Sequence, residues 1–363
     1  MKKLDSYILK KYLTTFFFCL LLLTTIVVVV DISEHTEDFV KANISASQIV
    51  TDYYFGFIPR IIAMLFPLFI FISVIFFTSK MAGRSEVIAI LSGGVTFNRY
   101  LRPFLIGGFF MALLLWIGYQ YVIPKANSKW ADFSKTYIDV NLGARKVGTY
   151  RQNIYFKTGE NEWVGIKGYD SVSKSGNNLF LQKFNNNALV YNLRAPNFQW
   201  DTISKKWKLS NVIERTFDSL NQTVTYSANQ LANFNFKPID LRKDDYIKDQ
   251  LTTPELNKYI EREIKKGSGE VNTLLVERYN RDAIPFSVLV LTVIGTVLAS
   301  KKVRGGSGIH LATGVILSVL YVLFSRLSVV FATQGNFSPL LAAWTPNIIF
   351  VIVALYLYSR SSK

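Results

Sequence analysis

Long uncharged runs of apolar residues lie toward both ends of the chain, and a polar stretch of about 150 residues separates them. Six such runs cover 12–30, 61–79, 103–123, 283–300, 305–325 and a last segment that ends at Ser359. Each is near the roughly 20 residues that an α-helix needs to cross a bilayer. The pattern predicts six membrane helices in two groups of three, with the last two separated near 333–339.

Lysine and arginine gather in the connections on one side of these predicted helices. The basic residues of these connections and of the two termini are Lys2, Lys3, Lys10, Lys11, Lys80, Arg84, Arg99, Arg102, Lys301, Lys302, Arg304, Arg360 and Lys363. The connection after the first helix is acidic instead, with Asp31, Glu34, Glu37 and Asp38. Because cytoplasmic loops carry an excess of Lys and Arg, we expect both termini in the cytoplasm and the central polar block outside it.

The central block has the pattern of a β domain. Its short segments are rich in aromatic and β-branched residues and lie at 153–157, 162–167, 178–184, 188–193, 198–200, 206–209 and 223–226. Glycine and asparagine clusters at 175–178 and 185–187 predict turns between them. Several short strands at close spacing favour a sandwich or jelly roll.

A helix is predicted after the β block. Thr253 is expected as its N-cap, Pro254 as its first helical residue and Gly267 as its end. The expected division of the chain is therefore 1–123 for three membrane helices, 124–252 for the β domain, 253–282 for a connecting helical segment and 283–363 for three further membrane helices.

Composition agrees with a membrane protein. Of 363 residues, 50% are hydrophobic and only 18% are charged, whereas soluble chains are about one quarter charged. The net charge of +16 needs no nucleic-acid partner, because much of it flanks the predicted helices. The single cysteine, Cys19, excludes an intramolecular disulfide and a cysteine-based zinc site.

Residues with catalytic chemistry are scarce. The chain has no GxxxxGK[ST] loop, so we expect no ATP site of its own. His35 and His310 are far apart and lack metal-ligand spacing. No pair of acid and base converges in the sequence, and we therefore expect neither an enzyme nor a bound cofactor.

The segment 80–94 has a mixed face and ends in glycine, which predicts a short cytoplasmic helix. Two interpretations of it are open. It is either a basic connector that lies along the inner leaflet or a coupling helix through which an ATPase subunit acts on the membrane helices.

Five short motifs resemble one known family. The chain opens with L-D-S-Y-I at 4–8 and continues with A-G-R-S-E at 82–86 and S-G-G at 92–94. After the β block come R-D-A-I-P at 281–285 and A-W-T-P-N at 343–347. In order and spacing, over essentially the whole chain, these motifs closely resemble the lipopolysaccharide-export permease family (LptF/LptG, YjgP/YjgQ type).

The resemblance implies an α+β membrane protein, with six transmembrane helices in a 3+3 plan and an inserted periplasmic domain like a β-jelly-roll. It implies a multi-pass protein of the bacterial inner membrane that pairs with a second, paralogous permease and a cytoplasmic ABC ATPase dimer, which uses the ATP. Such permeases extract lipopolysaccharide and pass it to a periplasmic bridge of jelly-roll proteins, together with a single-span membrane protein. The first and fifth helices form the lateral gates in the family.

Candidate site residues follow from the motifs and the topology. For ATPase coupling they are Arg84, Ser85, Glu86, Ile88 and Leu91. Because the exit of the first helix is acidic where family members often carry lysine, lipid phosphates are expected to contact Arg60, Arg278, Arg281 and Arg326, with Arg326 favoured. The expected acyl-chain path through the β domain comprises Ile154, Phe156, Trp163, Leu181, Leu189 and Tyr191.

Two other functions are considered beside lipid export. A membrane-anchored assembly protein would use its β domain to dock partners without transport, and would not need a glycine-terminated coupling helix. A membrane enzyme would need a converging acid and base, which the sequence lacks.

The topology is testable by labelling intact cells with a membrane-impermeant thiol reagent. In a Cys19→Ser background, Ser175→Cys should be labelled and Ser361→Cys should be protected, because only the central block is expected outside the cytoplasm. Protection at position 175 with labelling at position 361 would reverse the predicted orientation.

Overall fold

The computed structural model describes residues 3–138, 150–171, 173–186, 188–218, 221–234, 236–241, 246–301, 307–335 and 337–361. The chain splits into two compact units. The helical unit comprises Met1–Trp130, Asp249–Leu256 and Asn272–Lys363. The β unit comprises Ala131–Lys248 and Asn257–Val271. Each unit is described by itself below.

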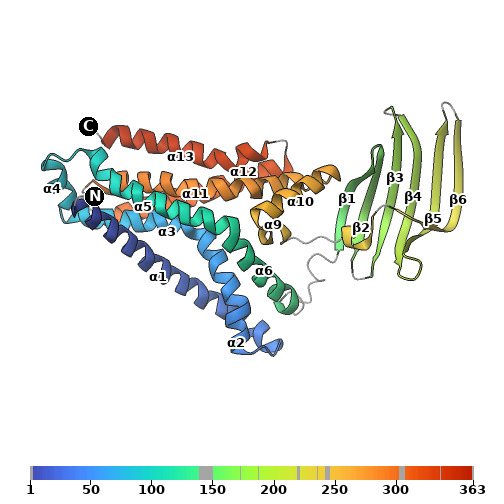
Figure 1. The fold of residues 1–363 in the computed structure, drawn as a ribbon, viewed down its shortest axis with the longest axis horizontal. Helices are drawn as coiled ribbons and strands as arrows, with labels where there is room; N and C mark the ends of the chain where they lie inside the picture. Colours follow the sequence, from blue (N-terminus) through green and yellow to red (C-terminus); the bar gives the residue numbers. More distant parts are fainter. Residues whose placement is uncertain are drawn as a thin grey trace. The chain divides into compact units, whose positions relative to one another are not determined.

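Six helices are long and apolar enough to cross a membrane, which confirms the predicted number. They are built on α1 (Lys3–Lys41), α3 (Phe55–Gly83), α5 (Phe97–Ile117), α11 (Val271–Ala299), α12 (Ser307–Gln334) and α13 (Pro339–Ser361). The break between α12 and α13 agrees with the predicted split, and residues 305–306 of the fifth apolar run lie outside the described residues. In Figure 1 the two chain ends lie at the same end of the helical unit, near α4.

Shorter helices connect or extend the long ones. They are α2 (Ala46–Gln48), η1 (Ile49–Tyr54), α4 (Glu86–Ser92), η2 (Gly118–Val122), α6 (Ile123–Phe133), η3 (Ser134–Ile138), α8 (Pro238–Leu241), α9 (Ile247–Gln250) and α10 (Thr253–Lys265). The π-helical segments η1 and η2 run directly into α3 and out of α5, so these two membrane helices continue beyond their apolar cores.

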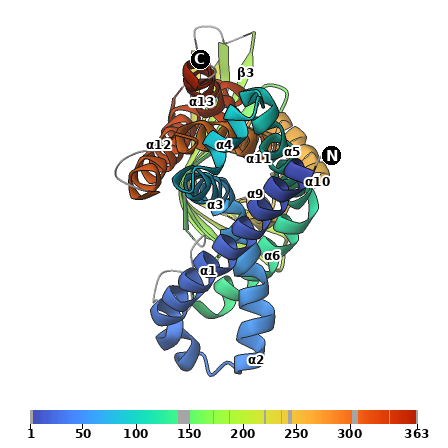
Figure 2. The same cartoon turned by 90° about the vertical axis from the view of Figure 1, so that its left-hand side faces the viewer.

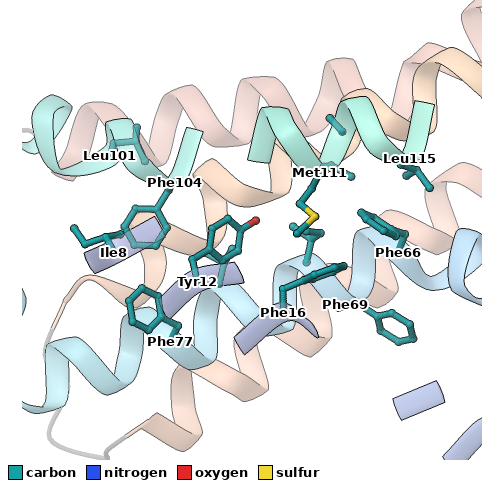
Figure 3. Close-up of a cluster of buried hydrophobic side chains, with 14 of the residues drawn as sticks. Ile8, Tyr12, Phe16, Phe66, Phe69, Phe77, Leu101, Phe104, Met111 and Leu115 are labelled. Carbon is teal, nitrogen blue, oxygen red and sulfur yellow. The ribbon is translucent and has the colours of Figure 1, made fainter. Parts of the chain in front are cut away.

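The first half of α1 is held by aromatic packing against α3 and α5. Its side chains Ile8, Tyr12 and Phe16 recur every four residues and therefore share one helix face. Figure 3 shows them among phenylalanines of α3 and α5, and all three are buried. Gly107 of α5 allows the close approach, because a Cβ there would lie 2.7 Å from the ring of Tyr12.

The second half of α1 leaves the bundle. In Figures 1 and 2 the helix diverges from α5 and leads toward α2. Between Phe16 and Asp31 none of its residues is buried, and Phe18 and Leu21 are 62% and 67% exposed. Apolar side chains exposed over such a length need lipid or another protein as their neighbour.

The C-terminal helices pack around α11. Val288, Leu291 and Ile294 of α11 are buried, in contact with clusters from α3, α12 and α13. Gly314 brings α12 against α3, since a Cβ at this position would lie 2.3 Å from Ile75. These contacts place α3 and α12 side by side.

The β unit is a six-stranded antiparallel sheet. Its strands are β1 (Tyr150–Gly159), β2 (Glu162–Asp170), β3 (Ser175–Asn185), β4 (Ala188–Asp201), β5 (Lys206–Asp218) and β6 (Asn221–Ala232). Each strand pairs with the next one along the chain, in the order β1-β2-β3-β4-β5-β6. The inserted antiparallel domain confirms the predicted α+β class.

One face of the sheet is buried under an aromatic cluster. Ile166, Leu181 and Leu193 are almost fully buried on this face. Trp207 is completely buried and donates a hydrogen bond of 3.0 Å from Nε1 to the carbonyl oxygen of Phe236, which follows the last strand. The segment after β6 therefore covers the core of the sheet.

Two strand-level predictions were wrong. The glycine and asparagine cluster at 175–178 lies inside β3 and is not a turn. Gly176 is needed there because a Cβ would meet the ring of Phe198 at 2.4 Å, and Asn178 takes the left-handed φ of 50° that asparagine tolerates. The segments 188–193 and 198–200 form one strand, β4.

In the predicted turn at 185–187, Asn186 has a φ of 47° and Asn187 lies outside the described residues.

The start of α10 differs from the prediction by one residue. The helix begins at Thr253, so Thr252 is the N-cap, and Glu255 accepts hydrogen bonds from the Thr252 amide at 2.9 Å and hydroxyl at 2.6 Å. A Thr at the N-cap with Glu three residues later is a capping-box pair. The Thr253 hydroxyl is engaged elsewhere, because it accepts a hydrogen bond from Arg281. Gly267, with a φ of 63°, lies just beyond the helix end as predicted.

Candidate functional site

The opening motif of α1 binds two other elements of the helical unit. Asp5, only 5% exposed, forms an ion pair of 2.7 Å with Arg99 of α5. The Tyr7 hydroxyl donates a hydrogen bond of 3.3 Å to Glu86 Oε2 of α4. The start of α1 is therefore linked to both α4 and α5.

The short helix α4 is set off from its neighbours by backbone turns. Ser85, just before it, has a left-handed φ of 62°, and Gly94, just after it, has a φ of 84°. Such conformations end one helix and redirect the chain into the next. Val87 is buried in the core of the unit, which anchors α4.

The five predicted coupling residues have different surroundings. Arg84 and Ile88 are exposed. Glu86 is partly buried and lies 3.9 Å from Arg84 as well as near Tyr7. Leu91 packs against the core. Arg84 and Ile88 are thus open to a partner, while Glu86 and Leu91 also hold α4 in place.

The motif residues of α11 and α13 meet in a second polar cluster. Asn347, 1% exposed, donates a hydrogen bond of 2.7 Å to the carbonyl oxygen of Ala283 and accepts one of 3.1 Å from the Tyr321 hydroxyl. Asp282 accepts a hydrogen bond of 2.9 Å from Trp116 Nε1. These contacts join α5, α11, α12 and α13.

Two of the four arginines predicted to contact lipid are paired within the chain. Arg278 Nη1 lies 2.6 Å from Asp282. Arg281 is 1% exposed, donates from Nη1 to the Thr253 hydroxyl at 3.1 Å and lies 3.5 Å from Glu277. Arg281 therefore connects α11 to α10, whereas Arg278 pairs within α11.

The other two arginines line one cavity of about 340 Å³. Its walls come from α3, η2, α6, α9, α11, α12 and α13. Arg60 stacks on Trp130, with its guanidinium carbon 3.8 Å from the ring centroid, and Arg326 Nη2 lies 3.9 Å from Met64 Sδ. Among the described residues, neither guanidinium has a carboxylate within the 4.0 Å of an ion pair. This cavity is the candidate lipid site.

The residues of the predicted acyl-chain path lie in different surroundings in the β unit. Ile154 and Leu181 are buried in its core, and Phe156 and Tyr191 pack against that core. Burial, reinforced by the carboxylate of Glu214, raises the pKa of Tyr191 to about 12, so its phenol is neutral at physiological pH. Leu189 is half-buried at the start of β4.

Trp163 lies apart from this cluster. It is 40% exposed, opposes Lys157 in β1 and Gln182 in β3, and contacts Gly267 after α10. Because side chains alternate between the faces of a sheet, its neighbours Glu162 and Val164 point the other way.

Two polar features of the helical unit were not predicted from the sequence. Asp31 is buried and accepts hydrogen bonds of 3.0 Å from both Tyr53 and Tyr54. Asn127 is buried beside the cavity and donates to the carbonyl oxygen of Asp249 at 2.9 Å. The consecutive tyrosines were a possible signal for the first feature. The second depends on residues far apart in the chain.

The comparisons with known proteins place this geometry in a family. The family model described as "Lipopolysaccharide export system permease LptF/LptG" matches residues 6–360, nearly the whole chain. The chain belongs to the LptF/LptG family. No curated protein matches it. The motifs noted in the sequence supply Tyr7 and Glu86 at α4 and Asp282 and Asn347 in the second polar cluster.

The arginines of the helical unit should separate by their effects on stability. Arg281→Gln should lower the thermal unfolding temperature of the purified full chain in detergent, because it removes buried hydrogen bonds worth on the order of 2 kcal/mol. Arg326→Gln should leave that temperature unchanged, since this side chain is exposed. Equal stability of the two variants would contradict a structural role for Arg281.

Proposed function

We propose that this chain is one permease subunit of an ABC transporter that extracts lipopolysaccharide from the inner membrane and passes it to a periplasmic bridge toward the outer membrane. The family match over residues 6–360 carries the proposal. The chain supplies no catalysis in this scheme, and ATP is hydrolysed by a separate cytoplasmic ATPase dimer. Both termini and α4 face the cytoplasm, and the β unit lies in the periplasm.

In this proposal, helix α4 transmits the conformational change of the ATPase to the membrane helices. Force on Arg84, which precedes α4, and on Ile88 of α4 passes to α1 through the contact of Tyr7 with Glu86. It reaches α3 and α5 through the buried Val87. An ATPase at this site therefore acts on three membrane helices at once.

The apolar surfaces of α1 and α12 are proposed to contact the second permease and the substrate. Exposed residues such as Leu21 on α1 and Phe331 on α12 supply large apolar area. Lipopolysaccharide carries several acyl chains, which need a surface of this extent and not a small cavity. The single-span protein and the jelly-roll bridge would complete the path beyond the membrane.

The four arginines predicted to contact phosphate divide into two pairs. Arg60 and Arg326 line the cavity and lack carboxylate partners among the described residues, so their guanidinium groups are open to the phosphate of a lipid that enters this cavity. Arg278 and Arg281 are committed to Asp282 and Glu277 and act as positioning residues.

Coupling is tested by Glu86→Lys in the reconstituted complex. The substitution reverses the charge beside Tyr7 and Arg84 and removes charge-assisted hydrogen bonds worth about 2 kcal/mol each. Lipopolysaccharide release driven by ATP should fall at least tenfold, while the chain stays in the membrane. Glu37→Lys, at an exposed site near the other end of α1, is the matched control and should leave release unchanged. Normal release by the Glu86 variant would remove α4 from the coupling route.

The β unit is tested by site-specific photo-crosslinking. Crosslinkers at Leu181 and Tyr191, on the core face, should capture lipopolysaccharide only when ATP is supplied. Ile203 and Tyr226, which are 92% and 73% exposed, are the controls. Capture confined to these exposed sites would instead favour a docking domain that carries no acyl chain.

A further inference from the structure

The cavity of the helical unit has both polar and apolar lining residues. Arg60, Arg326 and Asn127 lie among its polar lining, and Met64, Leu68 and Val322 are among its apolar walls. From Arg60 to Leu68, eight residues of α3 rise about 12 Å. The hydrocarbon of one leaflet is roughly 15 Å deep, so this wall has the length of one acyl chain in a leaflet.

The charged residues of the lining suit a phosphate. Arg60 and Arg326 bring two guanidinium groups to the lining, and guanidinium binds phosphate through two parallel hydrogen bonds. Two carboxylates, Asp249 and Glu277, line the same cavity. Glu277 is paired with the buried Arg281 at 3.5 Å, and this pairing offsets its charge.

Asn127 adds a requirement for a hydrogen-bond donor. Its Nδ2 donates to the Asp249 carbonyl oxygen at 2.9 Å, and this acceptor fixes the orientation of the amide. Its Oδ1 is then left buried without a partner in the described part of the chain. An unsatisfied buried acceptor carries a free-energy cost. A ligand that carries an N–H or O–H group near its phosphate would remove this cost.

Size decides the kind of lipid. A volume of about 340 Å³ is at the lower end of the range for small-molecule sites. It has room for a headgroup phosphate and part of one acyl chain, and the several chains of lipopolysaccharide exceed it. The apolar part also lies within one chain, between α3 and α12, and does not need a second permease to form its walls.

We propose that this cavity binds one glycerophospholipid of the surrounding membrane. Its phosphate contacts Arg60 and Arg326, a donor group of its headgroup bonds to Asn127 Oδ1, and one acyl chain lies between α3 and α12. The second acyl chain stays in the bilayer. The site is separate from the surfaces along which the proposed function moves lipopolysaccharide, and it does not depend on export.

Native mass spectrometry of the delipidated full chain tests the headgroup requirement. The probes are dioleoyl lipids with ethanolamine, glycerol or choline headgroups. The first two carry donors and should bind at least tenfold more tightly than the choline lipid, which carries none. Equal binding of all three lipids by the wild-type chain would overturn the proposal, and this comparison needs no variant to fold.

Variants then locate the site. Arg60→Gln with Arg326→Gln should weaken binding of the ethanolamine lipid at least tenfold, whereas Arg102→Gln, an exposed arginine of α5, should not. Asn127→Leu should abolish the preference for donor-bearing lipids while the phosphate contacts remain. Unchanged binding by the double arginine variant would show that the lipid lies elsewhere.

Competition separates this site from other ligands. Inorganic phosphate at millimolar concentration and purified lipopolysaccharide should each leave the bound phospholipid in place. Displacement by phosphate would indicate a simple anion site, and displacement by lipopolysaccharide would assign the cavity to the exported substrate. Both results would overturn the proposal. Export itself is measured separately with the Glu86→Lys complex, so the two proposals can fail independently.

Discussion

The helical unit depends on a few pairs of strongly polar groups that its apolar helices bury. Hydrocarbon offers no hydrogen bonds, so an unpaired amide or charge there costs several kcal/mol. Asp5 with Arg99 fixes one end of α1, and Asn347 with Ala283 and Tyr321 fixes α13 to α11 and α12. Apolar packing alone does not select one arrangement of such apolar helices. These few directional hydrogen bonds and ion pairs select it, and most of their polar groups lie in the motifs noted in the sequence.

The pairing also separates two kinds of arginine. Arg281 is surrounded by Thr253 and Glu277 and has no surface left for a ligand. Arg326 lies 3.9 Å from the Met64 sulfur and remains exposed. Position in the sequence could not distinguish these roles, because all four arginines were predicted to contact lipid phosphates. The side chains that surround each arginine in the folded unit make the distinction.

The number of membrane helices and the fold class were predictable because both depend on local composition. Runs of apolar residues predicted all six long helices, and clustered aromatic and β-branched residues predicted the β domain. The interior of the sheet was harder to predict. Gly176 and Asn178 look like a turn in sequence but lie in β3, where Gly176 leaves room for the ring of Phe198. The lining of the cavity was not predictable, since Arg60, Asn127 and Arg326 meet only in the folded unit.

The uneven attachment of α1 has a mechanical consequence. Asp5 and Phe16 mark the buried contacts of its first half, and Asp31 is clamped by two tyrosines further along. Among the described residues, no hydrogen bond links the stretch between Phe16 and Asp31 to another helix. That stretch can bend sideways within the bilayer while both of its ends stay attached. Its bending exchanges apolar neighbours for lipid tails, and no interhelical hydrogen bond has to break.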